Sequence, residues 1–479
     1  MWLQISQYSL LGIGAGILTL AHVVLSAGVS IHILRRKRDV GAAMAWMGLV
    51  WLSPFLGSLL YLGFGINRVK RRARRLRKRR PRIVGPKRHR AAKPQPDHFA
   101  PLELAASLLT RRPMQPGNDV RMLRNGDEAY PLMIAAIEGA KHSIGLSSYI
   151  FRVDGAGNQF IDALARARRR GVAVRVLIDG FGGNYIRSPA WHRLRQEGVP
   201  AARFLHTHVP WRMPFLNLRN HKKILCVDGH VGFTGGLNIS ADNLLKTKPP
   251  NAVRDTHFRF EGPVVDQLVE AFTEDWQFTT GEDLDSNAWF PREVPTRGSA
   301  VARAIKSGPD EDFEKIEFVT LHAISCARQS IRILTPYFLP HDGLITALEL
   351  AAMRGVEVEI VVPQHTDQRL ADWARRAQIQ PLVESEGCHV YLSPPPFEHS
   401  KLMVVDDAWA MIGSANWDTR SFRLNFELNV EIHDARLTRQ ISEAITRRRG
   451  PELTPDQVAD YPFLVEMRDR AARLLLPYL

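Results

Sequence analysis

Residues 221–228 read His-Lys-Lys-Ile-Leu-Cys-Val-Asp, and residues 399–406 read His-Ser-Lys-Leu-Met-Val-Val-Asp. Both fit the pattern HxKxxxxD, and after six intervening residues a second element, G[GS]xN, follows at 235–238 and at 413–416. Six fixed positions at roughly one in twenty each give a chance match of order 10⁻⁸ per starting point. Two copies in one chain therefore indicate a repeated functional element.

Each motif has the pattern of a strand that enters a buried sheet. Side chains at i and i+2 of a strand point to the same face, so the His and Lys of each HxK share one face. The apolar runs at 224–227 and 402–405 predict buried strands. The glycines that follow bring backbone close to this site, and the Asn that ends each element adds an amide donor.

The repeat predicts one site built from two halves. If the halves meet, two His, two Lys and two Asn surround one point: His221, His399, Lys223, Lys401, Asn238 and Asn416. Fixed donors of this kind suit a phosphodiester anion, because they stabilise the extra negative charge of its transition state. Such a site needs no metal and no other cofactor. We count Asp228 and Asp406 with the catalytic residues, although support of the local architecture is the role that we favour for them.

The sequence from about residue 97 has the pattern of a soluble α/β protein that repeats itself. In each copy two strands enclose a helix, an Arg-Gly-Val sequence joins the helix to the second strand, and a Tyr follows the first strand. The predicted elements are strands at 143–149 and 172–178 around a helix at 159–170, and strands at 330–335 and 356–362 around a helix at 344–354. The stretch 281–299 is irregular and acidic, so we expect halves at 98–290 and 291–479.

Two apolar segments, 10–34 and 41–66, contain no Asp, Glu, Lys or Arg. About 20 such residues cross a bilayer as a helix, so we predict a membrane hairpin over residues 1–67. A signal peptide is disfavoured for the first segment, because its N-terminus lacks a basic region and its apolar part exceeds roughly 7–15 residues. His22 and His32 lie in this segment and are expected to pack between helices or lie at the membrane interface.

The net charge of +15 (64 Lys and Arg against 49 Asp and Glu) comes from one segment, because Arg68–Lys93 contains 15 basic residues and no acidic one. We interpret 68–97 as a polybasic juxtamembrane linker that attracts anionic lipid headgroups. A solvated linker without that role is the alternative. The remaining chain is near neutral, which disfavours a nucleic-acid partner, because nuclease grooves generally carry positive charge themselves.

The basic residues also predict the orientation of the hairpin. Lys and Arg near a membrane segment stay on the cytoplasmic side, so residues 68–93 place the body in the cytoplasm. The basic loop at 35–38 conflicts with two full crossings, because it would then lie outside. Pro54 offers a solution, since a proline breaks or kinks a helix and permits a re-entrant segment.

With its paired HxKxxxxD motifs, the sequence resembles the phospholipase D superfamily, and most of all the bacterial cardiolipin synthases within it. The resemblance covers nearly the whole chain and includes 43–46 (Ala-Met-Ala-Trp), 61–65 (Tyr-Leu-Gly-Phe-Gly), 217–221 (Asn-Leu-Arg-Asn-His) and 421–428 (Ser-Phe-Arg-Leu-Asn-Phe-Glu-Leu). It implies an α/β fold with two α/β/α halves, pseudo-twofold symmetry and a shared active site. It also implies a bacterial inner-membrane enzyme that converts two phosphatidylglycerol molecules to cardiolipin and glycerol.

The resemblance implies a role for each His. One must be neutral to attack phosphorus and form a phosphatidyl-histidine, and the other must be protonated to release glycerol. The family assigns the first role to His221 and the second to His399. Asp255 and Glu427 match the acids that orient the imidazoles.

Two further classes of function stay open at this point. A phospholipase D hydrolase, or a synthase that uses phosphatidylethanolamine as donor, has the same chemistry, because water and a lipid hydroxyl are attacking groups of one kind. A phosphodiester nuclease is the less favoured alternative. The three cysteines, Cys226, Cys326 and Cys388, lie far apart, which excludes a disulfide scaffold. His206 and His208 form HxH in a Pro-rich setting without a carboxylate partner, so we do not expect a metal there.

Overall fold

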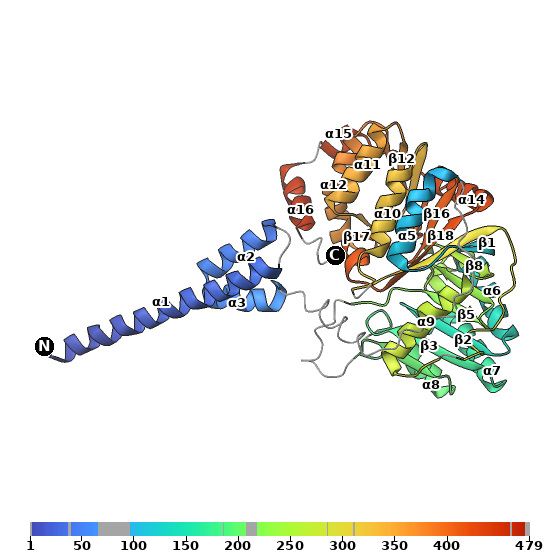
Figure 1. Cartoon of the computed structure of the whole chain (residues 1–479), viewed down its shortest axis with the longest axis horizontal. Helices are drawn as coiled ribbons and strands as arrows, with labels where there is room; N and C mark the ends of the chain where they lie inside the picture. Colours follow the sequence, from blue (N-terminus) through green and yellow to red (C-terminus); the bar gives the residue numbers. More distant parts are fainter. Residues whose placement is uncertain are drawn as a thin grey trace. The chain divides into compact units, whose positions relative to one another are not determined.

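The computed structural model describes residues 2–36, 40–65, 96–184, 186–206, 218–284, 286–309, 312–459 and 462–474 (Figure 1). The chain forms two compact units, Met1–Arg75 and Leu76–Leu479. The described strands all lie in the second unit. The predicted polybasic segment Arg68–Lys93 lies outside the described residues.

The first unit is helical. It contains α1 (Trp2–Arg36), α2 (Val40–Leu52), α3 (Pro54–Leu60) and a π-helical turn at Tyr61–Gly65. Among the helices described, only Gly16–Arg36 of α1 is long and apolar enough to cross a membrane, with a mean hydropathy of 2.0. The second apolar segment is divided between Leu52 and Pro54, at the proline that predicted a break. The membrane hairpin over residues 1–67 therefore stays a prediction.

The second unit is built on one continuous sheet of 14 strands in the order β13-β12-β10-β15-β16-β18-β9-β1-β8-β6-β5-β2-β3-β4. The order has mirror symmetry about the β9–β1 pair, where Gln115 lies opposite Ala302. The main strands of the first half are β1 (Gln115–Arg124), β2 (Ser143–Ser148), β3 (Ala173–Asp179), β4 (Ala201–Phe204), β5 (Ile224–Val227), β6 (Val231–Gly235) and β8 (Thr256–Glu261). Their counterparts are β9 (Ala300–Ser307), β10 (Ser330–Leu334), β12 (Glu357–Pro363), β13 (Cys388–Ser393), β15 (Leu402–Val405), β16 (Trp409–Gly413) and β18 (Glu427–His433).

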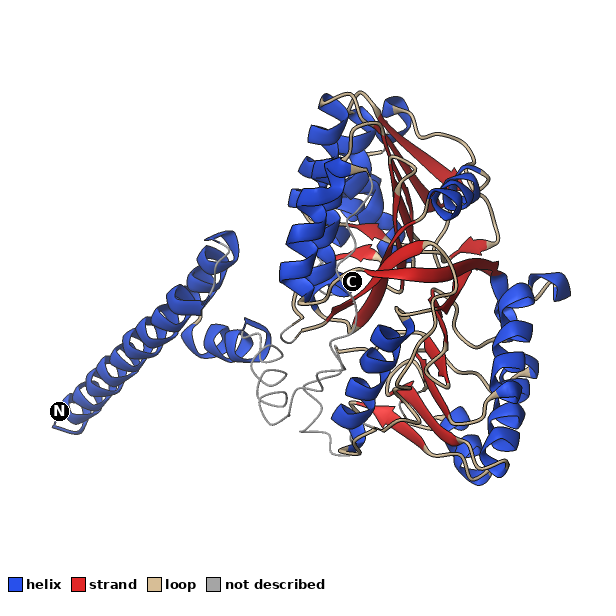
Figure 2. Ribbon diagram, turned by 45° about the vertical axis from the view of Figure 1, so that its right-hand side comes forward, coloured by secondary structure: helices blue, strands red, loops and turns tan. Residues whose placement is uncertain are grey.

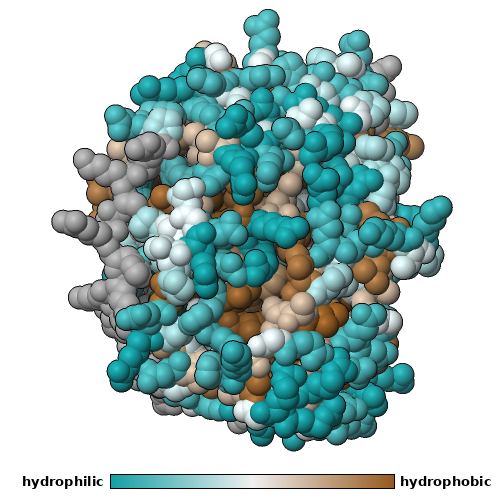
Figure 3. All heavy atoms as spheres, turned by 90° about the vertical axis from the view of Figure 1, so that its right-hand side faces the viewer, coloured by the Kyte–Doolittle hydropathy of each residue, from teal (hydrophilic) through white to brown (hydrophobic). Residues whose placement is uncertain are grey.

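Helices cover both faces of this sheet, as Figure 2 shows. The longer ones are α5 (Ala100–Thr110), α6 (Asn125–Gly139), α7 (Gly155–Arg169), α8 (Pro189–Gln196), α9 (Val265–Thr280), α10 (Lys315–Cys326), α11 (Asp342–Met353), α12 (Arg369–Glu384), α14 (Ala435–Thr446) and α16 (Phe463–Arg473). Short helices are η2 (Asp97–Phe99), η4 (Ala241–Asn243), η5 (Leu245–Thr247), α13 (Thr419–Arg423) and α15 (Pro455–Ala459). Buried aliphatic and aromatic side chains form two main cores, and the core of the second half also includes Phe99, Leu102 and Ala106 from the start of the first half. One side of the body is mostly hydrophilic, with hydrophobic side chains gathered near its centre (Figure 3).

The predicted βαβ repeat is confirmed in both halves. Strands β2 and β3 are parallel and enclose α7, and strands β10 and β12 are parallel and enclose α11. Gly171 and Gly355, at the two Arg-Gly-Val joints, have φ of 92° and 84°, a conformation that glycine adopts without strain. The mirror-symmetric sheet confirms the predicted pseudo-twofold arrangement of two α/β/α halves. The sequence did not reveal that one sheet runs through both of them.

Candidate active site

The two HxKxxxxD motifs occupy equivalent places in the sheet. The apolar runs form β5 and β15 and are buried, as predicted. Strand β5 is antiparallel to β2, and β15 is antiparallel to β10, so each HxK lies beside the carboxyl end of the first strand of its βαβ unit. The βαβ topology thus places His221 and His399 at the same edge of the sheet as the loops that follow the parallel strands.

Backbone pairing interlocks the two halves around the histidines. The His221 N–H donates to the Phe426 carbonyl oxygen at 2.9 Å, and the His399 N–H donates to the Arg254 carbonyl oxygen at 2.7 Å. The strand β14 (Phe397–Glu398) pairs in parallel with β7 (Val253–Arg254), which belongs to the other half. Each histidine therefore enters the site along a segment of the opposite half.

The orienting carboxylates are also exchanged between the halves. His399 Nδ1 lies 2.7 Å from Asp255 Oδ2. His221 Nδ1 lies 3.1 Å from Glu427 Oε2 and 3.0 Å from the Ser414 carbonyl oxygen. Because Nδ1 of both rings is engaged in this way, Nε2 is the atom that each imidazole presents to a substrate.

The two lysines make matching contacts. Lys223 Nζ donates to the His221 carbonyl oxygen at 2.7 Å, and Lys401 Nζ donates to the His399 carbonyl oxygen at 2.5 Å. Both lysines are almost fully buried. Burial, with the neighbouring positive charge as a further cause, lowers the pKa of Lys223 to about 7. Burial lowers the pKa of Lys401 to about 8. In the empty site, each lysine therefore loses its proton, and its positive charge, close to neutral pH.

Burial shifts the four acid and imidazole groups toward their neutral forms. It is the largest cause that lowers the pKa of His221 and of His399 well below the usual range, and the two lysines add to the effect. It raises the pKa of Asp255 and of Glu427 to about 7. The site therefore concentrates ionisable groups in a low-dielectric setting, where an entering anion changes their protonation strongly.

The G[GS]xN elements fit around the carboxylates. A side chain at Gly236 would meet Asp255, since a Cβ there would lie 2.1 Å from Oδ1. At the equivalent position Ser414 Oγ donates to Glu427 Oε2 at 2.5 Å. The oxygen of the Asn238 amide accepts the Ile150 N–H at 3.2 Å, which leaves the amide nitrogen as the donor group. Asn416 is buried and its side chain hydrogen-bonds Asp418.

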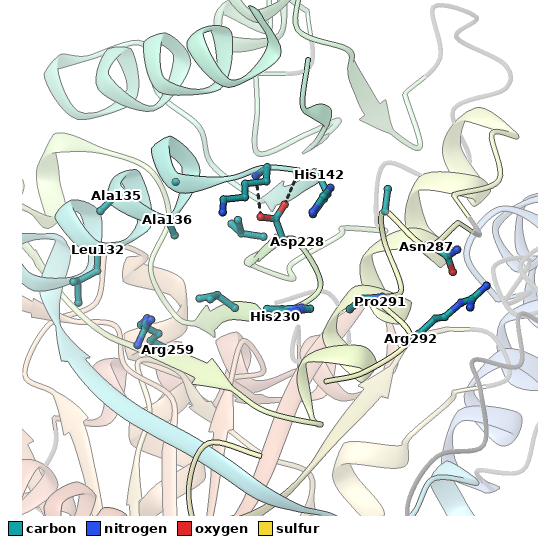
Figure 4. A pocket seen from close by; sticks show the side chains of 15 residues that line it. Leu132, Ala135, Ala136, His142, Asp228, His230, Arg259, Asn287, Pro291 and Arg292 are labelled. Carbon is teal, nitrogen blue, oxygen red and sulfur yellow. Dashed lines mark hydrogen bonds between the residues drawn. The ribbon is translucent and has the colours of Figure 1, made fainter. Parts of the chain in front are cut away.

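The motif aspartates lie apart from this cluster. Asp228 accepts the backbone N–H groups of residues 141–143 at 2.7–2.9 Å, beside the start of β2, and Figure 4 shows it in a surface pocket. Asp406 accepts those of residues 328–330 at 2.7–3.0 Å. Seven residues of extended chain, about 23 Å, separate each aspartate from its His. These backbone contacts support the architectural role that we favour for Asp228 and Asp406.

Several groups near the site were not assigned a role by the sequence. The Tyr149 ring meets His221 edge-on at a centroid distance of 4.9 Å, with Lys223 Nζ 5.2 Å from its centre. His257 is buried and follows Asp255 by two residues. This i, i+2 spacing is the sequence signal by which His257 could have been found. Away from the site, His98 Nε2 lies 2.9 Å from Asp406 Oδ2, a contact between distant residues that no spacing predicts.

Within the described residues, no three His, Cys, Asp or Glu side chains form a group that could hold a metal ion. His206 is described, whereas His208 lies outside the described residues. The three cysteines, Cys226, Cys326 and Cys388, are unpaired thiols. Nothing in the arrangement of the described side chains therefore supplies a metal centre to the histidine pair.

Comparison with known proteins agrees with this geometry. The model of the family described as "Cardiolipin synthase, PLD-like domain" matches residues 133–276 and 320–449, and a model described as "Phospholipase_D-nuclease N-terminal" matches residues 24–65. A cardiolipin synthase of Geobacillus kaustophilus is 32% identical over 98% of this chain and 94% of its own. A cardiolipin synthase of Alkalihalophilus pseudofirmus is 32% identical over 94% of this chain and 92% of its own.

A solved structure shows the same fold. The phosphatidylserine synthase of Haemophilus influenzae superposes with a TM-score of 0.60 at 16% identity, covering 79% of this chain and all of that one. The family model matches both repeats, and relatives are 32% identical over nearly the whole length. The similarity therefore extends beyond the fold to the sequence. The chain belongs to the cardiolipin synthase family of phospholipase D-like phosphatidyltransferases.

Proposed function

We propose that this chain synthesises cardiolipin by transferring a phosphatidyl group between two phosphatidylglycerol molecules through a phosphatidyl-histidine. The observation that carries the proposal is the exchanged pairing of His221 with Glu427 and of His399 with Asp255. Two imidazoles, each oriented through Nδ1 by the opposite half, supply one nucleophile and one acid.

In the first step, Nε2 of neutral His221 attacks the phosphorus of one phosphatidylglycerol. A phosphorus–nitrogen bond forms and the bond from phosphorus to the glycerol oxygen breaks. His399 gives its Nε2 proton to that oxygen, so free glycerol leaves. The buried carboxylate of Glu427 stabilises the positive charge that develops on the His221 ring.

In the second step, a hydroxyl of the second phosphatidylglycerol attacks the same phosphorus. Its proton passes to Nε2 of His399, the phosphorus–nitrogen bond breaks, and cardiolipin is released with both histidines in their starting states. Lys223, Lys401, Asn238 and Asn416 are the donors proposed to hold the phosphoryl oxygens.

The shifted pKa values suit this sequence of events. In the empty site, burial favours the neutral forms, which makes His221 nucleophilic. A phosphodiester anion adds a negative charge beside the imidazoles and the lysines, and this charge favours their protonated forms. His399 thus takes up a proton from water when the substrate binds and acts as the acid, and no metal or other cofactor is required.

We also propose that the enzyme is a multi-pass protein of the bacterial inner membrane with its catalytic body in the cytoplasm. The apolar helix Gly16–Arg36 and the 15 basic residues of 68–93 support this orientation. Phosphatidylglycerol and other anionic membrane lipids are the expected partners, and nucleic acid is not one.

The experiment is to reconstitute the full chain in vesicles with headgroup-labelled phosphatidylglycerol, in excess chelator and without nucleotide. We expect cardiolipin and free glycerol in equal amounts. Phosphatidic acid as the main product would instead identify a hydrolase. Cardiolipin formed only after phosphatidylethanolamine is added would identify that lipid as donor. Activity lost in chelator and restored by a divalent ion would contradict the metal-free mechanism.

A further inference from the structure

The C-terminal helix α16 carries its apolar side chains on the outside. Phe463 is 70% exposed and Leu464 is 79% exposed, and Met467 and Leu474 are also exposed. Positions 463, 467, 471 and 474 follow the i, i+4, i+8, i+11 spacing of one helix face. A soluble surface helix normally has the opposite pattern, so this face is one that a partner covers.

The inner face of α16 is held by polar contacts and one small residue. Asp469 is only 3% exposed and accepts two hydrogen bonds from the guanidinium of Arg376 in α12, at 2.6 and 3.1 Å. Ala472 packs in a buried cluster with Leu339. The helix is therefore fixed in this orientation, and its apolar face is not an effect of loose packing.

The same contacts connect α16 to the active site. Leu339 lies in β11 (Phe338–Leu339), which pairs with β17 (Trp417–Asp418) so that Leu339 lies opposite Asp418. Asp418 is hydrogen-bonded by the side chain of Asn416, one of the proposed phosphate donors. The C-terminal end of α16 is thus one strand pair away from the catalytic cluster.

The first half has an exposed apolar surface of its own, in a loop that contacts the site. Ile186 is 84% exposed, and Phe181 is about half exposed, in the loop that follows β3. Gly182 in this loop packs against Tyr149, where a Cβ would meet the carbonyl oxygen at 2.4 Å, and the Tyr149 ring contacts His221. Exposed apolar side chains therefore flank the catalytic cluster in both halves.

We propose that these two surfaces, the outer face of α16 and the loop at Phe181 and Ile186, dock the catalytic body on an anionic bilayer with the active site facing the lipid. The inference rests on the proposed function, in which the substrate is a membrane lipid. The phosphodiester of such a lipid lies at the membrane surface while its acyl chains stay in the hydrocarbon, so the active site must face that surface. The apolar residues lie beside Arg470 and Arg473, which pair with Glu466 and Asp342 at 2.8 and 3.3 Å but keep 58% and 44% of their side chains exposed, so both guanidinium groups are accessible to lipid headgroups.

The experiment uses the full chain in vesicles of phosphatidylglycerol and phosphatidylethanolamine. A single cysteine at position 464, with Cys326 changed to Ser and the buried cysteines retained, carries an environment-sensitive fluorophore. Spin-labelled lipid should quench this probe. The matched control is a probe at Met353, which is 78% exposed at the end of α11 farthest from the site and should not be quenched.

A second measurement compares activities. The double variant Phe463→Ser, Leu464→Ser should lose about tenfold in cardiolipin formation on vesicles, because two interfacial apolar contacts are removed. It should retain its turnover of short-chain phosphatidylglycerol in detergent. The control pair Leu350→Ser, Met353→Ser should retain both activities.

Absence of quenching at position 464, or equal quenching at 353, overturns the proposal. A blue-shifted but unquenched probe at 464 also overturns it, and identifies a protein surface as the occupant. If the unaltered chain forms no cardiolipin, the proposed function fails, yet lipid quenching at 464 still establishes the docking surface.

Discussion

The exchange of orienting carboxylates between the halves predicts a specific pattern of energetic coupling. The perturbation is Glu427→Gln, combined in one double-mutant cycle with His221→Ala and in another with His399→Ala. Glu427 is completely buried, and both of its oxygens lie about 3 Å from His221 Nδ1. At pH 8, above its pKa of about 7, this is a charge-assisted hydrogen bond worth about 1.5–3 kcal/mol.

The assay is the free energy of unfolding by denaturant, in detergent, for each single and double variant. Glu427 also accepts hydrogen bonds from Ser414 and Asn425, but these losses appear in both backgrounds and cancel in the cycle. We expect a coupling of about 2 kcal/mol between Glu427 and His221, and less than about 0.5 kcal/mol between Glu427 and His399. The Asp255→Asn variant serves as the reciprocal control and should couple to His399. Stronger coupling of Glu427 to His399 would refute the exchanged arrangement.

Three further predictions follow from the same site. His221→Ala, His399→Ala and the double variant should lose cardiolipin formation to a similar, non-additive extent, and robust turnover by either single variant would refute the shared site. Inorganic phosphate should bind at pH 8 with proton uptake, measured by calorimetry in two buffers of different ionisation enthalpy. The reason is that Lys223 and Lys401, with pKa values of about 7 and 8 in the empty site, become protonated beside an anion. Phosphate binding without proton uptake would contradict these lowered pKa values. Asp406→Asn should lower the free energy of unfolding by about 1–3 kcal/mol, because it weakens three backbone hydrogen bonds. The folded variant should keep a kcat within a few-fold of that of the unaltered chain. A loss of kcat without a loss of stability would assign Asp406 to the chemistry.

Sequence reasoning was strongest where spacing has a direct geometric meaning. The i, i+2 relation of each HxK and the apolar run behind it predicted β5 and β15 at their observed bounds. Repetition of strand, helix and strand predicted two equivalent halves. Asp255 and Glu427 were named by family resemblance, and the structure places both within hydrogen-bond distance of an imidazole.

What the sequence did not reveal depends on contacts between distant residues. No spacing in the chain shows that His221 is served by an acid 206 residues away. The continuous sheet depends on the pairing of β1 with β9, and nothing in the sequence of either strand identifies the other as its partner. The partners of the motif aspartates, the backbone N–H groups of residues 141–143 and 328–330, also lie far from the motifs in the sequence, so the motifs do not show them. The apolar face of α16 was not predicted, because the side chains of α16 that are exposed depend on which face of the helix packs against α12.

In the proposed mechanism, one phosphatidyl-histidine, formed at a site shared by both halves, carries the transferred group. The most direct measurement is rapid quenching of the full chain in mildly alkaline denaturant, where a phosphorus–nitrogen bond survives, during turnover of labelled phosphatidylglycerol in the His399→Ala background, followed by mass spectrometry of the peptides at alkaline pH. With its acid and base removed, His399→Ala should accumulate the adduct slowly and fail to discharge it. We predict a phosphatidyl group on His221 alone. An adduct on any other residue, or product formation with no adduct at any time, would contradict the account.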